Sequence, residues 1–367
     1  MRKALIIAGV MVLAAMVIVF GTAWYFSGKV LAIESRELPT VTVVDSDVSS
    51  ITLGANELSM SAGQFGLRWP GGSAVSDGVI STDGKTVKRG LVEVKGTVPS
   101  AGAVAWNRNV WEGNPEQSLH IGFQDVNVVS GLGDMPAWFV PGPSSTWVIA
   151  VHGRGDDRSA ALRVLPVVKD AGMPMLVTTY RNDVGAPRSP DGKDHLGDTE
   201  WEDVDAAISY ARQHGAQRVV LCGWSKGGAM VLTALHRSSQ AEVISGVVLD
   251  APVVDWRSTL KLQAKKRHVP SPVGGLAMWM VEQRGGLDLD DFSQAPEAAE
   301  IQVPVLLLQG NADETVPVAA AKKFAASNPR RIQLELFPTA QHTAEWNADE
   351  TRYEQLVSQF LQPLGSS

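Results

Sequence analysis

The sequence predicts an α/β fold: a mostly parallel β-sheet with helices on both faces and a helical cap insertion, preceded by an N-terminal transmembrane helix and a β-rich accessory region. Three observations carry this prediction. Residues 4–26 contain no charged side chain, residues 41–143 form short apolar or alternating runs, and from residue 145 onward apolar runs alternate with amphipathic ones. Nearly continuous apolar strands joined by amphipathic helices are typical of a parallel sheet buried on both faces. The predicted segments are 1–26, 27–118 and 119–367, with the insertion at 256–300.

The composition excludes several classes of protein. A chain of 367 residues with 44% hydrophobic and 19% charged residues is globular rather than disordered. A net charge of -7 argues against general nucleic-acid binding. The single cysteine, Cys222, excludes an intramolecular disulfide and a cysteine-rich zinc site, and its apolar surroundings indicate a core residue.

The N-terminal segment is long enough to cross a bilayer. Residues 4–26 would form a helix about 34 Å long at about 1.5 Å per residue, against a hydrocarbon core of about 30 Å. A cleaved signal peptide is the alternative, but its apolar stretch normally has only about 7–15 residues, and no clean A-x-A site follows. We therefore expect a retained single-pass anchor, with Arg2 and Lys3 in the cytoplasm and the soluble bulk of the chain on the other side of the membrane.

The elements follow one another along the chain. Residues 27–40 are expected to form a linker, and the turn-rich runs between 41 and 143 are expected to form short strands that merge into the main domain. The main domain is predicted to have strands at 145–153, 173–182, 218–224, 244–252, 303–311 and 331–338, and helices at 159–172, 199–215, 229–237, 318–327 and 349–361. The alternation stops at 256–300, where residues 256–268 and 274–284 are predicted to be two helices of an insertion.

The stretch Gly223–Gly228 (GWSKGG) lies between a predicted strand and a predicted helix. In G-x-S-x-G, two glycines leave room for a strained turn that lifts a serine hydroxyl out of the sheet. Ser225 is therefore the predicted nucleophile. The backbone N–H of Lys226 is expected to point at the space above the serine, where it can stabilise an oxyanion.

Polar residues at other strand ends supply the partners that such a serine needs, because functional groups in an open parallel sheet collect at the carboxyl ends of its strands. His342 follows the last predicted strand and is the predicted base. Asp313 is the preferred acid to orient it, with Asp250 as a competitor whose alternative role is a turn or helix-cap carboxylate. The loop His152–Gly155 (HGRG) offers a second oxyanion donor, with Gly153 and Arg154 as the expected residues.

These motifs, VHGRG, GWSKGG, QGNADETVP and QHTAEW, resemble those of the α/β-hydrolase superfamily, in the order serine, acid, histidine. The chain is similar to its prolyl oligopeptidase-like and BEM46-like branches over roughly residues 120–365, whereas residues 27–115 carry no motif that points to a family. The resemblance implies a mostly parallel eight-stranded sheet and a cap inserted after the strand that ends at Asp250. It also implies a Ser225–Asp313–His342 triad.

Three weaker patterns have two interpretations each. Five basic residues of the insertion could face anionic lipid or an anionic substrate, but a solvated helix face is preferred; they are Lys261, Lys265, Lys266, Arg267 and His268. The apolar run at 274–281 is expected to be the wall of an acyl pocket or plain packing. An acidic loop could bind calcium, but a solvated loop is preferred; its residues are Asp191, Asp194, Asp198, Asp203 and Asp205.

The function predicted from these features is a membrane-anchored serine hydrolase that cleaves carboxylic esters, with lipid and cell-envelope esters among the candidates. Ser225 would form an acyl-enzyme, with no cofactor and no metal. The alternatives are a serine peptidase for short peptides, an acyltransferase, and a non-catalytic member of the fold that binds a ligand or partner. The expected partners are a small-molecule or lipid ester and the membrane, without nucleic acid, and the sequence identifies no protein partner.

Overall fold

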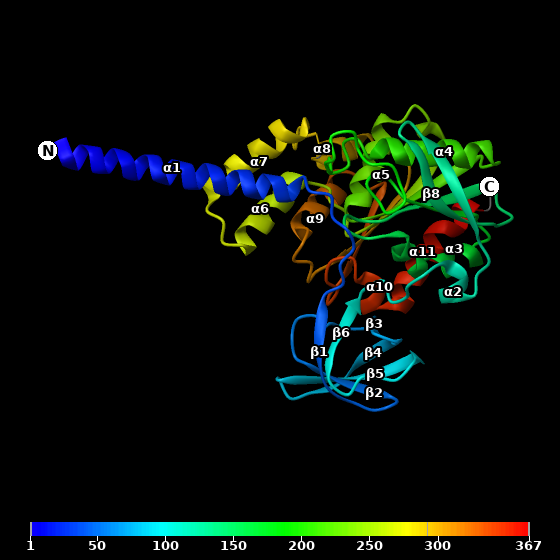
Figure 1. Ribbon diagram of the computed structural model, residues 1–367. Coiled ribbons are helices and arrows are strands. Elements are labelled where there is room, and N and C mark those ends of the chain that lie inside the picture. Colours follow the sequence, from blue (N-terminus) through cyan, green and yellow to red (C-terminus); the bar gives the residue numbers. More distant parts are fainter. Residues whose placement is uncertain (1, 292, 366–367) are drawn as a thin grey trace.

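The computed structural model describes residues 2–291 and 293–365 (Figure 1). Residues 1, 292 and 366–367, which belong to the predicted segments 1–26, 256–300 and 119–367, lie outside the described residues. The described chain forms a projecting helix, a small β-barrel and a larger domain built on an eight-stranded sheet.

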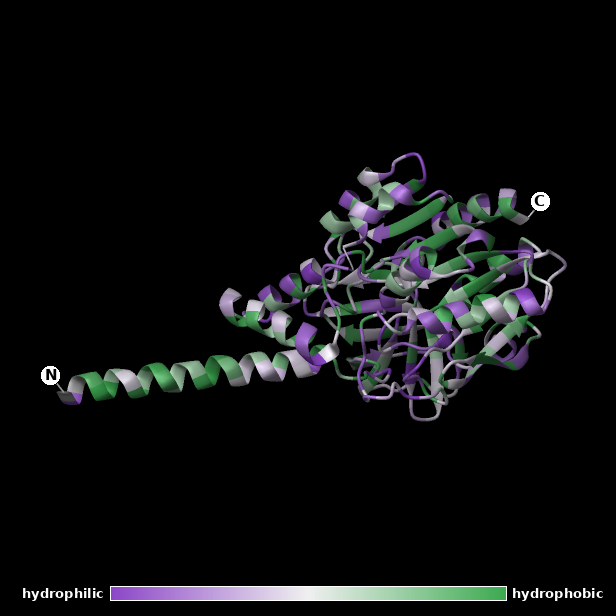
Figure 2. Ribbon diagram, turned by 90° about the horizontal axis from the view of Figure 1, so that it is seen from above, coloured by the Kyte–Doolittle hydropathy of each residue, from purple (hydrophilic) through white to green (hydrophobic). Residues whose placement is uncertain are grey.

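The N-terminal helix α1 (Arg2–Val30) runs four residues beyond the predicted end of the apolar segment. It is the one helix among the described residues that is long enough and apolar enough to cross a membrane, over Leu5–Val30. Most of its length projects away from the rest of the molecule and is apolar on all sides (Figure 2). The start of the expected linker is therefore helical.

The accessory region folds into a closed antiparallel barrel with the strand order β1-β2-β5-β4-β3-β6. Its strands are β1 (Thr40–Ser46), β2 (Ser50–Gly54), β3 (Phe65–Trp69), β4 (Gly72–Thr82), β5 (Thr86–Lys95) and β6 (Gly102–Asn107). Alternate residues such as Val41, Leu67 and Val104 fill the interior, as the period of two in a strand requires. The prediction of a β-rich region is confirmed, and closure into a barrel is a finding of the structure. A short helix, α2 (Pro115–Leu119), follows the barrel.

The larger domain contains a sheet with the strand order β14-β13-β12-β11-β9-β10-β8-β7. Its strands are β7 (Gln124–Ser130), β8 (Gly133–Val140), β9 (Thr146–Val151), β10 (Met175–Thr178), β11 (Arg218–Trp224), β12 (Ile244–Asp250), β13 (Val305–Gly310) and β14 (Ile332–Phe337). The strands from β14 to β10 in this order pair in parallel, whereas β8 pairs antiparallel with β10 and with β7. The prediction of a mostly parallel sheet is confirmed.

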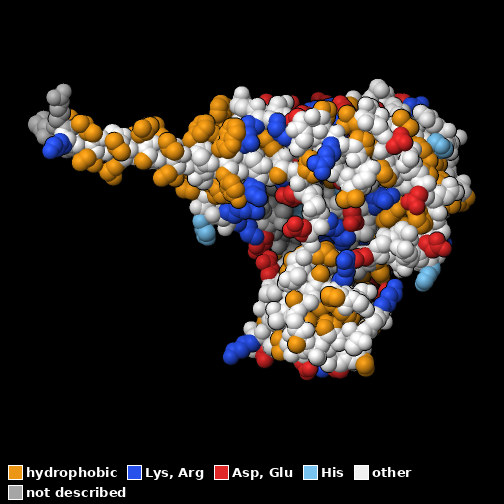
Figure 3. Space-filling model, in the orientation of Figure 1, with side chains coloured by type: hydrophobic (Ala, Val, Ile, Leu, Met, Phe, Trp, Pro, Cys, Tyr) orange, Lys and Arg blue, Asp and Glu red, His pale blue; other side chains and the backbone are white. Residues whose placement is uncertain are grey.

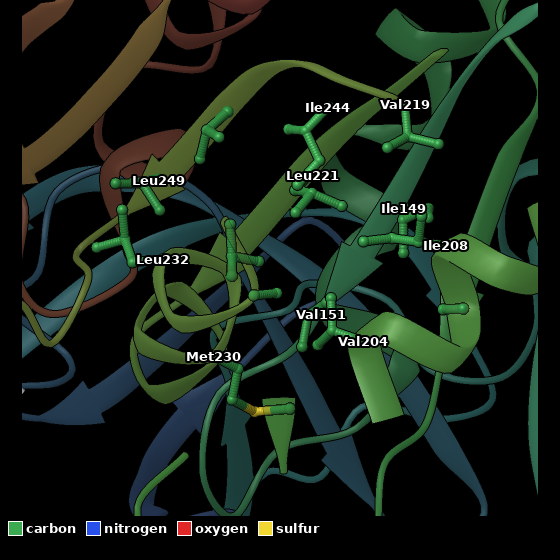
Figure 4. Packing of buried hydrophobic residues seen from close by; sticks show 14 of the residues in the cluster. Ile149, Val151, Val204, Ile208, Val219, Leu221, Met230, Leu232, Ile244 and Leu249 are labelled. Carbon is green, nitrogen blue, oxygen red and sulfur yellow. The ribbon is translucent and has the colours of Figure 1, made fainter. Parts of the chain in front are cut away.

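Helices cover both faces of this sheet. One face carries α4 (Trp201–Gln213), α5 (Lys226–Arg237) and α9 (Val318–Ser327), and the other carries α3 (Leu165–Asp170) and α11 (Glu350–Gly365). Val204 and Ile208 of α4 and Met230 of α5 pack on strand residues such as Leu221 (Figure 4). The predicted helix 159–172 is wrong in detail, because it is divided into a 3-10 helix (Arg158–Arg163) and α3. Pro166 lies in the first turn of α3, where its missing N–H is tolerated.

The insertion after β12 contains α6 (Trp256–Lys266) and α7 (Ser271–Gly285), joined by a short loop, and we call this pair the cap hairpin. The short helix α8 (Gln294–Glu297) and two 3-10 helices, Ala241–Val243 and Ala298–Glu300, lie on either side of it in the chain, and α10 (Glu345–Ala348) precedes α11. The cap hairpin lies alongside the last turns of α1 (Figure 1). Ala23 of α1 is fully buried against Ala277 and Met280 of α7.

Candidate active site

Ser225 lies on a strained turn between β11 and α5, with φ 51° and ψ -116°. The two positions that flank this turn, Gly223 and Gly227, have no room for a Cβ atom. A Cβ added to Gly223 would lie 2.6 Å from the carbonyl oxygen of Gly227, and one added to Gly227 would lie 2.1 Å from that of Val151. The turn therefore requires both glycines of the motif and presents the serine at the carboxyl end of β11.

His342 and Asp313 lie on the loops that follow β14 and β13, and His342 contacts both Asp313 and Ser225. The His342 Nδ1 lies 2.8 Å from Asp313 Oδ2, and His342 Nε2 lies 2.9 Å from Ser225 Oγ. With Asp313 ionised, Nδ1–H donates to the carboxylate, and Nε2 is left to accept the hydrogen bond of the serine hydroxyl. The structure thus brings together the three residues that the sequence predicts as a triad.

The carboxylate of Asp313 is held in place by donors other than the histidine. Its Oδ1 accepts hydrogen bonds from the backbone N–H groups of Thr315 (2.7 Å) and Val316 (2.9 Å), and its Oδ2 accepts one from Gln309 Nε2 (2.9 Å). Burial opposes ionisation, but His342 and the two backbone donors outweigh it, so the pKa of Asp313 lies below its ordinary value. Asp313 therefore stays negatively charged and fixed in orientation at neutral pH.

Asp250, the competing acid, does not bond to His342. It is fully buried at the end of β12, and its Oδ2 accepts a hydrogen bond of 2.9 Å from the hydroxyl of Tyr353. Its other neighbour is Glu345, whose Oε1 accepts the backbone N–H of Gly310 at 2.7 Å. Burial, the charge of Asp250 and a hydrogen bond to it raise the pKa of Glu345 well above its ordinary value. Its protonated form is therefore favoured next to the charge of Asp250.

The backbone N–H groups of Lys226 and Arg154 are the candidates to stabilise an oxyanion above Ser225. Lys226 is the first residue of α5, so its N–H has no partner within the helix. The carbonyl of Gly153 points inward, where it accepts a hydrogen bond of 2.9 Å from the hydroxyl of Tyr180. In a trans peptide the following N–H, that of Arg154, points the opposite way. Gly153 itself allows a close approach, since a Cβ there would lie 3.0 Å from Ser225 Cβ.

The side chain of Lys226 points away from this space. Its Nζ lies 2.6 Å from Asp194 Oδ2 and 3.5 Å from Glu200 Oε1, and all three residues are buried. Burial lowers the pKa of Lys226, but the two carboxylates outweigh it and raise the pKa overall. The solvated acidic loop predicted from the sequence is therefore partly wrong. Asp194 is buried in this ion pair, and Asp203 is buried in another with Arg181 at 2.8 Å, because each compensates a buried cation.

A buried histidine supports the loop His152–Gly155, which we call the oxyanion loop, and sequence reasoning did not assign this histidine a role. His152 stacks on Tyr180, its Nε2 lies 2.9 Å from Asp183 Oδ2, and its Nδ1 lies 2.9 Å from the carbonyl oxygen of Gly153. Burial lowers the pKa of His152, but Asp183 outweighs it and raises the pKa overall. Asp183 follows β10, so a carboxylate after a strand end was the signal for this contact.

A cavity of about 560 Å³ opens over Ser225 and His342. Its walls come from the cap hairpin, the oxyanion loop and the last turns of α1. Apolar side chains dominate the part that lies between helices: Phe26, Val30, Val253, Trp256, Leu260, Ala264, Val269, Ala277, Met278 and Val281. This volume is within the range of small-molecule sites, about 300–1,000 Å³. The predicted wall at 274–281 is present, and the contribution of α1 was not predicted.

Arg154 and Arg284 donate hydrogen bonds that hold the end of α1 against the domain. Arg154, on the oxyanion loop, donates to the carbonyl oxygens of Lys29 (3.1 Å) and Ala32 (2.7 Å), which lie at the end of the helix. Arg284 of α7 donates to the carbonyl oxygen of Trp24 at 2.8 Å and to Ser27 Oγ at 2.6 Å. The guanidinium of Arg284 also lies 3.8 Å from the centre of the Trp24 ring.

The sheet order, the strained serine turn and the helical cap together define an α/β-hydrolase. Residues 167–366, more than half of the chain, match the prolyl oligopeptidase family. The chain therefore belongs to the prolyl oligopeptidase family. Residues 40–107, which form the barrel, match a domain of unknown function (DUF8805).

Several known proteins are similar to this chain. The chain is 26% identical over 245 residues to the protein YfhR of Escherichia coli (strain K12), covering 63% of the chain and 77% of that protein. The esterase Pf2001 of Pyrococcus furiosus has a similar structure, with a TM-score of 0.56 and 19% identity over 69% of the chain and 96% of the esterase. The serine hydrolase CCSP0084 of Cycloclasticus zankles has a TM-score of 0.51 and 17% identity, over 67% of the chain and all of that protein. The family and the shared fold support a hydrolase.

Proposed function

We propose that this protein is a membrane-anchored serine hydrolase that cleaves carboxylic esters through an acyl-enzyme on Ser225. The observation that carries the proposal is the chain of hydrogen bonds from Ser225 through His342 to Asp313, at 2.9 and 2.8 Å. A serine hydroxyl is a weak nucleophile until a base removes its proton, and this arrangement places a base and its orienting acid at the right atoms.

The proposed reaction has two halves. Ser225 Oγ attacks the ester carbonyl carbon while His342 Nε2 takes its proton, and the resulting oxyanion accepts hydrogen bonds from the N–H groups of Lys226 and Arg154. The tetrahedral intermediate collapses as Nε2–H protonates the leaving alcohol, which gives an acyl-enzyme. Water then attacks the acyl carbon by the same route in reverse, and releases the carboxylic acid and the free serine.

The lining of the cavity favours esters over peptides. A peptide substrate needs free hydrogen-bonding groups for its backbone, but two charged residues of the lining, Asp156 and Arg154, already have partners. Asp156 accepts from Asn109 at 2.7 Å and pairs with Arg36 at 3.3 Å, and Arg154 donates to the backbone near the end of α1. The rest of the lining is mostly apolar, which suits an acyl chain.

The first test is labelling by a fluorophosphonate probe, which reacts with activated serines. We expect the wild-type protein to be labelled and the Ser225→Ala variant not to be. Absence of labelling in wild-type protein that unfolds cooperatively would overturn the proposal. A matched control is Ser238→Ala, because Ser238 lies at the far end of α5 and should leave labelling unchanged.

A serine peptidase is the second candidate, because the family to which the chain belongs is named after a peptidase, prolyl oligopeptidase. A panel of 4-nitrophenyl esters and aminoacyl 4-nitroanilides separates the two. We expect hydrolysis of the esters, and faster turnover of any anilide than of every ester would favour the peptidase.

We further propose that α1 is retained as a single-pass anchor with its N-terminus in the cytoplasm. Residues 5–21 of the helix are exposed and apolar, whereas its last turns contribute to the cavity, so cleavage near residue 26 would remove part of the site. Mass spectrometry of the membrane-extracted protein should detect peptides that begin within the first few residues. In sealed spheroplasts an added protease should digest the catalytic domain.

A further inference from the structure

The last turns of α1 form part of the wall around the cavity over Ser225. Four residues of this helix line it: Tyr25, Phe26, Lys29 and Val30. Phe26 also packs against the cap hairpin beside Val269 and Leu276. The proposed anchor is therefore part of the substrate site as well as an attachment to the membrane.

The cavity runs lengthwise between α1 and the cap hairpin. On α6 its lining residues recur at helical spacing from Trp256, next to the site, to Arg267, just past the end of the helix. On α7 they are Gly274, Ala277, Met278 and Val281, which also share one helix face. Eleven residue steps from Trp256 to Arg267 correspond to about 16 Å along α6. The cavity is thus elongated, and its far end lies at the tip of the cap hairpin.

The tip of the hairpin lies where α1 leaves the domain. Ala23 is the first fully buried residue of α1, and its neighbours Val273 and Ala277 are in the first half of α7. The exposed apolar part, residues 5–21, is about 26 Å long, close to a hydrocarbon core of about 30 Å. Trp24 and Tyr25 are about half exposed at the boundary, as expected for interfacial aromatic residues.

Basic side chains surround the same end of the cavity. Lys261, Lys265, Lys266 and Arg267 are all exposed. In Figure 3, basic side chains gather close to the apolar α1 where it meets the rest of the molecule. Exposed lysine and arginine at this depth suit contact with anionic headgroups. The far end of the cavity therefore faces the expected membrane surface.

We infer that the cavity takes the long acyl chain of a membrane lipid ester, which enters from the bilayer between α1 and the cap hairpin. This inference rests on the proposed function, because it assumes that Ser225 attacks an ester and that α1 is an anchor. The acyl chain would lie along α6, with its carbonyl at Ser225 and its terminal methyl toward the hairpin tip. Each buried methylene should raise kcat/KM roughly fourfold until the groove is filled.

The first experiment narrows the far part of the groove in the full-length protein. Gly274 lines the cavity, and a Cβ there would lie 3.6 Å from Ala264 Cβ, whereas a Cβ on the exposed neighbour Gly275 meets nothing within 4 Å. Gly274→Leu and Gly275→Leu make the same change in the same helix, so Gly275→Leu is the matched control. The substrates are 4-nitrophenyl butyrate, octanoate, dodecanoate and palmitate in detergent.

We expect wild-type kcat/KM to rise with chain length and Gly274→Leu to lower it at least tenfold for dodecanoate and palmitate while leaving butyrate unchanged. Gly275→Leu should match the wild type. An equal loss at every chain length, or no loss, would overturn the inference. Phe26→Ala provides a second variant should Gly274→Leu fold poorly, with Phe20→Ala as control because Phe20 is exposed further along α1.

The second experiment tests whether the chain comes from the bilayer. Full-length protein is reconstituted in phosphatidylglycerol–phosphatidylcholine vesicles, and a self-quenched diacyl phosphatidylcholine is placed either in the same vesicles or in separate ones. We expect hydrolysis only when enzyme and lipid share a bilayer. Equal hydrolysis in both arrangements, or none in either, would overturn access from the membrane. Fluorophosphonate labelling of Ser225 with a flat chain-length profile would refute this inference and leave the proposed function standing.

Discussion

Replacing Asp313 by Asn tests which acid orients His342. Asp313 Oδ1 accepts two backbone N–H groups, so the asparagine carbonyl would keep that position, and its amide NH₂ would take the place of Oδ2. Two donors already face that atom, His342 Nδ1–H and Gln309 Nε2. The histidine would have to present a lone pair at Nδ1 and carry its proton on Nε2, where it can no longer accept the proton of the serine.

The expected loss in kcat/KM is about 10³–10⁴-fold, or about 4 to 5.5 kcal/mol of transition-state stabilisation. The control is Asp250→Asn, because Asp250 ends the neighbouring strand but bonds to Tyr353 instead of His342. It should cost about 1–3 kcal/mol of stability by weakening a buried hydrogen-bonded pair, with kcat/KM within about tenfold of the wild type.

The assay is steady-state hydrolysis of 4-nitrophenyl butyrate near neutral pH, combined with thermal unfolding of each variant. If Asp250→Asn lost more than a hundredfold in kcat/KM while Asp313→Asn stayed within tenfold of the wild type, the reasoning from the hydrogen bonds would be refuted. A loss of activity that simply follows the loss of stability in both variants would also count against it.

Three further predictions concern the rest of the fold. Folding raises the pKa of Glu345, so the stabilisation by this residue is complete below its unfolded pKa of about 4.3 and is lost as the pH rises through the higher folded value. Glu345→Gln keeps a donor toward Asp250 and should therefore gain Tm relative to the wild type as the pH of thermal unfolding is raised. A difference in Tm that stays constant with pH would contradict this. Arg89 is fully buried in the barrel and donates to Ser76 Oγ at 2.7 Å and to backbone carbonyls, so Arg89→Met should destabilise the protein by about 3 kcal/mol or more, measured by denaturant unfolding, and a change under 1 kcal/mol would be contrary evidence. Arg284→Ala removes the two hydrogen bonds that Arg284 donates to α1 and should speed limited proteolysis between α1 and the barrel several-fold, with the exposed Arg267→Ala as control. Equal rates of proteolysis would argue against a helix that Arg284 holds on the domain.

Much of the fold was predictable because local pattern and tertiary structure agree in the main domain. Buried parallel strands are apolar throughout, and the covering helices show the expected periodicity, so the succession of strands and helices along the chain could be predicted directly. Ser225, His342 and Asp313 were predictable for the same reason, since each follows a strand of one parallel sheet. The side chain of Lys226 was not, because its partners Asp194 and Glu200 lie in a loop whose path depends on the whole domain.

The role of α1 in the cavity could not be predicted either. The helix is apolar on all sides, so its sequence marks no face for packing against protein rather than lipid. Closure of the barrel depends on pairing between β1 and β6, which lie about sixty residues apart, and nothing local in either strand specifies that partner. In both cases the deciding contacts are long-range, and sequence periodicity reports only local structure.

The sequence left open whether Asp313 or Asp250 contacts His342, and the structure decides for Asp313. Three carboxyl groups, Asp250, Asp313 and Glu345, lie near the ends of β12 and β13, and like charges in a buried site cannot all ionise. Burial and the charge of Asp250 favour the protonated form of Glu345, whereas Asp313 has His342 and two backbone donors to stabilise its charge, and Asp250 has Tyr353. In its protonated form Glu345 adds no negative charge beside the two aspartates, which limits the repulsion that would otherwise favour protonation of Asp313. The charge states of the two aspartates thus depend on residues of α10 and α11, which follow both aspartates in the chain and bear no mark of this role in their own sequence.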